Sequence, residues 1–137
     1  MLMLESLGFD EAQRALACGL DEAHRRDLKM SFAVADLAGS LIACQRMDGA
    51  PARTLTHAMR KAYTSAKMGR DTSRFARDLQ ERGGDLTQWG NNRLTTLSGG
   101  CVVMREGHVL GAVACGGAPT TVDEEIAQLM VVAALGD

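Results

Sequence analysis

Two short apolar segments around a glycine turn, followed by a polar turn and an amphipathic stretch, constrain this chain most. Residues 32–35 and 41–45 flank the first turn, where Gly39 supplies the positive φ that a tight hairpin often needs. Residues 46–51, Arg-Met-Asp-Gly-Ala-Pro, then end the second strand, because proline cannot donate to a sheet ladder. The sequence therefore predicts a β-hairpin that leads through a polar corner into a helix.

Three segments have the apolar spacing of amphipathic helices. Apolar residues recur at helical spacing over 9–28, from Thr54 to Gly69, and over about 73–82. We expect Thr54 to cap the second of these helices and Gly69 to end it. Residues 85–98 are the least periodic stretch, and they predict a long loop with local strand character near its end.

A second hairpin and a last helix complete the pattern. Strands are predicted at 101–104 and 109–115, and a Thr-x-x-Glu capping box at 121–124 starts a helix. Hairpins without βαβ units indicate an antiparallel sheet with helices packed on it. No linker, low-complexity run or repeat divides the chain, so a single domain over 1–137 is expected.

Charge and cysteine usage exclude several classes of function. The net charge of −2 argues against a nucleic-acid binder. Lys and Arg nevertheless cluster between Arg46 and Arg93, which suits either a small anionic ligand or a solvated basic face. The four cysteines form no CxxC pair and the histidines lack close ligand partners, so no metal site is expected.

Neither a secretory signal nor a membrane span is expected from the sequence. The first residues, Met-Leu-Met-Leu-Glu, have no basic region, and no segment reaches the ~20 apolar residues of a transmembrane helix. These observations predict a cytoplasmic protein with free thiols.

His57 and Lys61 are the candidate catalytic residues. They lie four positions apart in the predicted second helix and so share one face of it. Together they can bind an anion, or His57 can act as a general base near neutral pH. The alternative for His57 is a partly exposed helix histidine with no partner.

Several backbone and side-chain groups are candidates for holding a carboxylate. Arg46 can form a bidentate pair with a ligand, or it can pair locally with Asp48. Gly116-Gly117 lies between a strand and a helix start, where amides can face an anion, or it can form a plain turn. Gly99-Gly100 precedes the other strand of that hairpin in a similar way, and both pairs would let a flat ligand approach the sheet.

Three other side chains complete the candidate ligand-binding set. Cys115 stands at a strand end before a helix, where a thiolate would have a lowered pKa, although a buried structural cysteine is the alternative. Trp89 and Tyr63 can each supply a flat wall on which an aromatic ligand stacks.

Taken in order, these segments form a pattern that spans nearly the whole chain without large gaps. The segments that carry it are Ala33-Val34-Ala35-Asp36, Gly39, Arg46-Met47-Asp48-Gly49-Ala50, Ala58 to Ser65 with Lys61-Ala62, Gly99-Gly100, Gly107, Gly111-Ala112, Gly117 and Asp123. The pattern resembles the GlcG/HbpS-like family of small haem-binding and haem-degrading-type domains.

This resemblance implies an α+β fold, a profilin-like α-β-α sandwich with an antiparallel sheet of about five strands, usually assembled into dimers or larger rings. Members include haem-binding sensors, C-terminal domains of PduO-type corrinoid adenosyltransferases, proteins of glycolate operons, and cofactor-free lyases that act on hydroxylamino aromatic acids. The fold is therefore implied more narrowly than the function.

The chain departs from the family at two places beside the expected pocket. A Gly-Gly-x-Pro segment becomes residues 99–102, Gly-Gly-Cys-Val, and loses its proline. A Gly-x-Ser-Gly segment becomes residues 114–117, Ala-Cys-Gly-Gly, and loses its serine hydroxyl. Both changes indicate a specialised ligand.

Three hypotheses of function follow. The first is a pocket protein that binds haem, a related tetrapyrrole or an aromatic carboxylate, with Arg46, Lys61 and His57 as contacts and haem as the only cofactor implied. The second is a cofactor-free lyase or hydrolase on a hydroxylaminobenzoate-type acid, with His57 as proton shuttle and Trp89 or Tyr63 as stacking wall. The third is an interaction module that builds a homo-oligomer.

Overall fold

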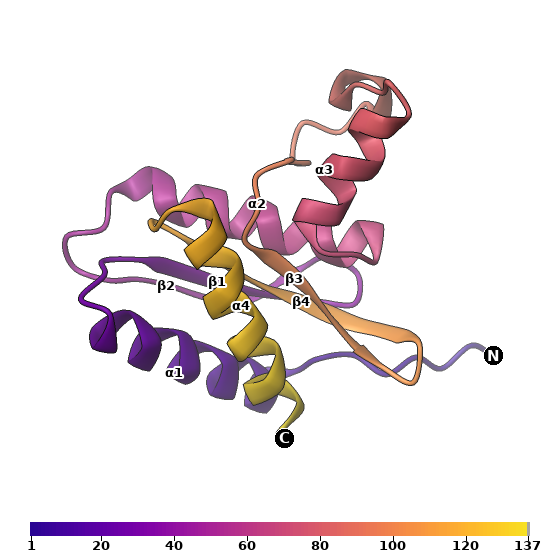
Figure 1. Cartoon of the computed structure of the whole chain (residues 1–137). Helices are drawn as coiled ribbons and strands as arrows, with labels where there is room; N and C mark the ends of the chain where they lie inside the picture. The colour runs from indigo at the N-terminus through magenta and orange to yellow at the C-terminus, as the bar shows by residue number, and fades with distance from the viewer. Residues whose placement is uncertain (137) are drawn as a thin grey trace.

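The computed structural model describes residues 1–136 and shows a four-stranded antiparallel sheet between helices (Figure 1). The strands are β1 (Ser31–Asp36), β2 (Leu41–Arg46), β3 (Gly100–Arg105) and β4 (His108–Gly116). Their order is β2-β1-β4-β3, so each predicted hairpin supplies one edge strand and one central strand. The α+β class is confirmed, with four strands in place of about five.

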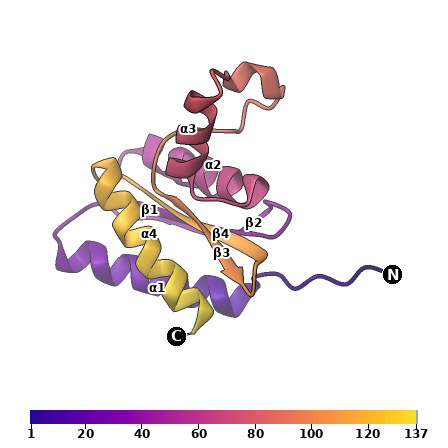
Figure 2. The same ribbon diagram turned by 45° about the vertical axis from the view of Figure 1, so that its right-hand side comes forward.

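Helices cover both faces of the sheet. On one face, α1 (Phe9–Arg25) and α4 (Thr120–Leu135) pack against each other, and α2 (Ala52–Met68) lies along the other face (Figures 1 and 2). A lobe made of α3 (Thr72–Glu81) and the 3₁₀ helix η1 (Leu86–Trp89) projects beyond α2 in both views. Among the helices of residues 1–136, none combines the length and the apolar character that a membrane span requires.

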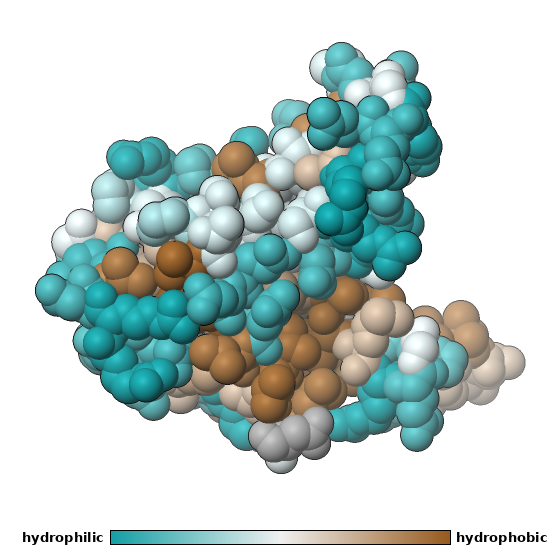
Figure 3. Space-filling view, in the orientation of Figure 1, coloured by the Kyte–Doolittle hydropathy of each residue, from teal (hydrophilic) through white to brown (hydrophobic). Residues whose placement is uncertain are grey.

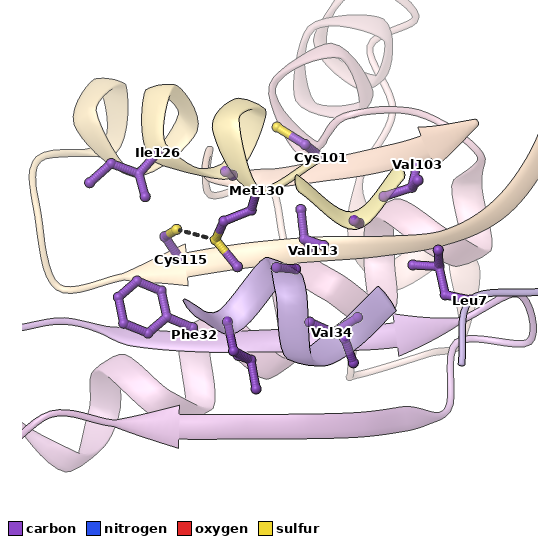
Figure 4. Close-up of a cluster of buried hydrophobic side chains, with 14 of the residues drawn as sticks. Leu7, Phe32, Val34, Cys101, Val103, Val113, Cys115, Ile126 and Met130 are labelled. Atoms are coloured by element: carbon purple, nitrogen blue, oxygen red, sulfur yellow. Dashed lines mark hydrogen bonds between the residues drawn. The ribbon is translucent and has the colours of Figure 1, made fainter. Parts of the chain in front are cut away.

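The larger core fills the space between the α1–α4 layer and the sheet. Phe32 of β1 and Cys115 of β4 point into it, as do Ile126 and Met130 of α4 (Figure 4). All four side chains are completely buried. Because burial of a large apolar side chain stabilises the fold by about 1.5–3 kcal/mol, this packing fixes the position of α4 and hence of its first turn.

A second core, made of alanines, lets α2 approach the sheet closely. Its members are Ala33, Ala35, Ala58, Ala62, Ala66, Ala112 and Ala114. Because these side chains are short, helix backbone lies against the strands. A Cβ on Gly100 would stand 2.6 Å from the carbonyl oxygen of Lys61, and one on Gly116 would stand 2.5 Å from that of Thr54. Glycine is therefore a packing requirement at both positions.

Two helices begin earlier than the sequence patterns predict. α2 starts directly after Pro51, and the Thr54 hydroxyl donates to the Pro51 carbonyl at 2.7 Å instead of capping the helix. α4 starts directly after Pro119, and the structure has no side-chain cap there, so the predicted capping box of Thr121 and Glu124 is wrong. The reason is that each proline already fixes the backbone at the turn, so the next residue can begin the helix.

The C-terminal end of α2 and the long loop before β3 follow the predictions more closely. Gly69 ends α2 in the left-handed conformation, with φ of 65°. The 85–98 segment is irregular apart from η1, but the strand character expected near its end is absent from the structure. The N–H of Thr95 donates to the Thr64 hydroxyl at 3.0 Å, so this part of the loop bonds to α2 and not to the sheet.

Candidate functional site

A buried ion pair joins the two helical layers at one end of the sheet. Lys61 lies on the alanine face of α2, and its Nζ donates to the carbonyl oxygen of Cys115 at 2.8 Å and to Oδ2 of Asp123 at 3.1 Å. The side chains are 3% and 2% exposed, respectively. The pair therefore links α2, the end of β4 and the first turn of α4 in one contact.

Burial dominates the electrostatics of this pair. It raises the pKa of Asp123, while the charge and hydrogen bond of Lys61 act in the lowering direction. The other carboxylate oxygen, Oδ1, accepts the N–H of Ala118 at 3.1 Å, so both oxygens have partners. A Cβ on Gly99, where φ is 124°, would lie 2.8 Å from Nζ of Lys61. Gly99 thus leaves the space that the pair occupies.

The glycines beside the pair lie in close contact with neighbouring backbone. The loop amide that faces an anion is that of Ala118, and the anion is the chain's own Asp123. Gly116 lies against α2, and a Cβ on Gly117 would stand 2.8 Å from the carbonyl oxygen of Lys29. The carboxylate bound at this turn is thus the chain's own, and it is bound by Ala118; a grip on a ligand by Gly116-Gly117 stays a prediction.

A separate cavity opens at the polar corner predicted from the sequence. Its volume is about 560 Å³, and we call it the corner cavity. The residues that line it are Leu20, His24, Lys29, Gln45, Arg46, Met47 and Asp48. Within residues 1–136 no ion pair joins Arg46 to Asp48, so the local pair weighed as an alternative is absent and both side chains are exposed.

Chain geometry explains why the corner cavity forms where it does. α1 ends before a turn in which Asp27 has a φ of 54°, and the chain then enters β1. Ser31 pairs with Arg46 across the hairpin, and the N–H of Met47 donates to the carbonyl of Met30 at 3.0 Å. The last turn of α1 is therefore held beside the end of β2.

The predicted aromatic wall lies elsewhere. Tyr63 is buried in a small cluster with Phe75 and Leu94, and Trp89 packs edge-on against Phe75 with ring centroids 5.8 Å apart. Neither Tyr63 nor Trp89 lines the corner cavity. The structure thus separates these aromatics from Arg46 and Asp48, and a role of Tyr63 or Trp89 as a stacking wall stays a prediction.

Cys115 is a core residue. Its side chain is completely buried in the larger core, and its Sγ lies 3.4 Å from Sδ of Met130 (Figure 4). Burial raises the pKa of its thiol well above the usual value. The predicted low-pKa thiolate is therefore wrong, and the alternative of a buried structural cysteine is the one that the fold adopts.

His57 is half-buried in α2, one turn before Lys61. Its charge acts to lower the pKa of Asp123, so the imidazole is electrostatically coupled to the buried pair. In the described part of the chain its side chain makes no hydrogen bond to another residue. Its role as a proton shuttle stays a prediction.

Sequence reasoning missed His24, Lys29 and Met47 as cavity residues. His24 gives no signal of its own, because charged neighbours surround it in the sequence and its side chain is exposed in the structure. The pairing of the first hairpin could have indicated these residues. If Ser31 lies opposite Arg46, the residues just before Ser31 must lie at the polar corner.

Comparison with known proteins places this fold and these segments in a family. A family model described as "Haem degrading protein HbpS-like" matches residues 7–131. The chain belongs to the HbpS-like family. The match spans all four strands and α4 as far as Val131, so it includes both the buried pair and the corner cavity of this HbpS-like protein.

Individual HbpS-like relatives agree with this assignment. Protein GlcG of Escherichia coli K12 is 32% identical over 102 residues, which are 74% of this chain and 75% of GlcG. A double mutant of HbpS from Streptomyces reticuli superposes with a TM-score of 0.87 at 26% identity, covering 96% of this chain and 89% of that one. PduOC, solved as a complex with haem, gives 0.84 at 22% identity over 93% and 94%, which is a likeness of fold.

Proposed function

We propose that this protein binds haem or a related tetrapyrrole, and that the corner cavity is the binding site. The observation that carries the proposal is the lining of that cavity, where His24, Lys29, Arg46 and Met47 meet. Support comes also from the description of the family and from the haem complex of PduOC. Four other cavities, beside η1, beside the N-terminal segment, between Arg14 and Arg105, and beside Arg93, each lack this combination of an imidazole, a thioether and two cations.

The residues of the corner cavity fit such a ligand in size and chemistry. A volume of about 560 Å³ lies within the range of about 300–1,000 Å³ typical of small-molecule sites. Lys29 and Arg46 are exposed cations that can each bind a propionate. Leu20 adds an apolar surface, while Asp48 lowers the net positive charge of the rim.

His24 is the side chain that would hold the iron. Histidine is a common axial ligand of haem, and His24 is exposed at the end of α1. Met47 is the other candidate, but its Sδ already accepts the N–H of Met30 at 3.4 Å. A bound haem would supply a redox-active iron, and the chain's own contribution is to orient the propionates and to ligate the metal.

Absorption titration tests the proposal. Added haem should give a shifted, saturable Soret band with the wild-type protein. Lys29→Gln and Arg46→Gln should weaken binding, because each removes a charge-assisted contact to a propionate. Haem dimethyl ester, which lacks these carboxylates, should bind the wild type and both variants alike.

Two results would contradict the site. One is a wild-type spectrum equal to that of free haem. The other is a haem affinity that is unchanged in both Lys29→Gln and Arg46→Gln. The control variant is Arg77→Gln, which removes an exposed positive charge on the projecting lobe.

We infer further that the protein self-associates through the outer face of α4. Leu129 and Val132 are 40% and 49% exposed, and Met104 of β3 is 39% exposed. Figure 3 shows apolar surface over the C-terminal half of α4 and beside it. Apolar surface of this kind favours a protein partner, and a second copy is the partner that the family resemblance implies. A light-scattering mass of one chain would refute this inference.

A further inference from the structure

A small cavity lies on the outward side of α2, where the loop before β3 crosses the helix. Its volume is about 180 Å³, and we call it the arginine cleft. Thr56, Met59 and Arg60 of α2 line it together with Arg93 of the loop. It shares no lining residue with the corner cavity.

The loop side of the arginine cleft is held in place by side-chain contacts. The guanidinium of Arg93 stacks over the ring of Tyr63, 3.8 Å from its centroid. The hydroxyl of Tyr63 accepts a hydrogen bond from Nδ2 of Asn91 at 2.8 Å, and Oδ1 of Asn91 accepts the backbone N–H of Arg93 at 3.0 Å. The stacked guanidinium is therefore positioned, while the N–H groups at its edge stay available.

The cations of the arginine cleft have no acidic partner in the described chain. Neither Arg60 nor Arg93 forms an ion pair within residues 1–136. α2 itself contains no Asp or Glu over its 17 residues, although it carries Arg53, Arg60, Lys61 and Lys67. Two like charges on the wall of one small cavity repel each other, and a bound anion would relieve that repulsion.

Size and lining then narrow the class of anion. A cavity of about 180 Å³ is smaller than the sites of about 300–1,000 Å³ that hold drug-sized ligands. A planar carboxylate matches the fork of a guanidinium, and the Thr56 hydroxyl can donate to it. Met59 is 38% exposed and offers a soft apolar wall of the kind that contacts rings well.

We propose that the arginine cleft binds a small carboxylate that carries an apolar body of about one ring, with Arg60 and Arg93 as the anion contacts. The site is independent of the corner cavity and of haem. It also gives a use to the local excess of basic residues between Arg46 and Arg93 that the sequence shows.

Calorimetric titration of the full chain with benzoate tests the proposal, with NMR of the arginine side-chain N–H signals as a second measurement. Benzoate should bind saturably at one site and shift the signals of Arg60 and Arg93. Arg60→Gln and Arg93→Gln should each weaken binding about tenfold or more, because each removes a charged hydrogen-bond donor. Arg93→Lys should also weaken it, since an ammonium cannot form the bidentate contact.

Matched controls separate a site from a diffuse basic surface. Arg77→Gln, an exposed arginine of α3, should leave benzoate affinity unchanged. Benzamide, the neutral isostere, and inorganic phosphate, which has no apolar body, should both bind more weakly than benzoate. Arg60 is exposed on a regular helix, so Arg60→Gln should keep the wild-type circular dichroism and thermal transition.

Three results would overturn the proposal. Benzoate affinity that is unchanged in both Arg60→Gln and Arg93→Gln would remove the assigned contacts. Equal losses in Arg77→Gln would indicate non-specific attraction to a basic surface. Equal affinity for phosphate or benzamide would exclude a site for an apolar carboxylate.

Discussion

Replacement of Lys61 by methionine should lower the stability of the fold more than a substitution at any exposed position of the same helix. The side chain is 3% exposed and its Nζ holds both Cys115 O and Asp123 Oδ2. Removal leaves a buried carboxylate without its cation, which costs about 3–5 kcal/mol in comparable buried pairs. For a domain of this size the expected fall in Tm is on the order of 10–20 °C.

Urea denaturation followed by circular dichroism measures this cost. At neutral pH, Lys61→Met should lower the free energy of unfolding by about 3–5 kcal/mol with an unchanged m-value. Arg53→Met, at an exposed position of α2, should change it by less than about 0.5 kcal/mol. The double variant Lys61→Met with Asp123→Asn should be more stable than Lys61→Met alone, because the uncompensated charge is gone.

The pH dependence gives a second check with a defined sign. Burial raises the pKa of Asp123 in the folded state, so the native protein binds this proton more tightly than the unfolded chain. The contribution of Asp123 to stability is therefore largest below the unfolded pKa and is lost as the pH rises through the folded pKa. In Lys61→Met the carboxyl loses its cation, so the cost of the substitution should shrink as the pH falls and Asp123 is protonated.

A loss of unfolding free energy in Lys61→Met below about 1 kcal/mol, equal at neutral and acidic pH, would contradict a stabilising buried pair. Such a result would mean that solvent reaches the pair, or that its charges contribute nothing to the link between α2 and α4.

Two further predictions follow from packing and burial. Gly116→Ala should destabilise the fold by several kcal/mol in thermal melts, because its Cβ would stand 2.5 Å from a backbone oxygen. Gly107→Ala should destabilise it less, because its Cβ meets open space and only the φ of 80° is strained. Under native conditions, N-ethylmaleimide should modify the half-exposed Cys44 long before Cys101 and Cys115, because burial raises the pKa of both of these thiols. Early labelling of Cys115 in mass spectra would contradict its place in the core.

The hairpins were predictable because the signals that specify them are local. Apolar runs flank Gly39 in the first hairpin and surround the turn at Gly107 in the second, and both turns form where the sequence places them. The helix starts were less predictable, because the prolines at 51 and 119 compete with nearby threonines that look equally like caps.

The candidate sites were predictable only in part, because their members are far apart in the chain. Lys61 was identified, but Asp123 lies 62 residues away and the sequence gives no distance between them. Arg46 and Asp48 were placed in a ligand-binding corner, and they do line a cavity. Its other residues come from the end of α1, which only the tertiary packing of that helix brings to the corner.

The position of the Soret band in histidine variants reports whether His24 ligates haem in the corner cavity. Haem added to His108→Ala, which changes an exposed histidine at the start of β4, should give the wild-type spectrum. His57→Ala should do the same, because His57 does not line the corner cavity. His24→Ala should lose the wild-type band and bind haem more weakly. A wild-type Soret band and affinity in His24→Ala would contradict the assignment of the corner cavity as the haem site with His24 as its ligand.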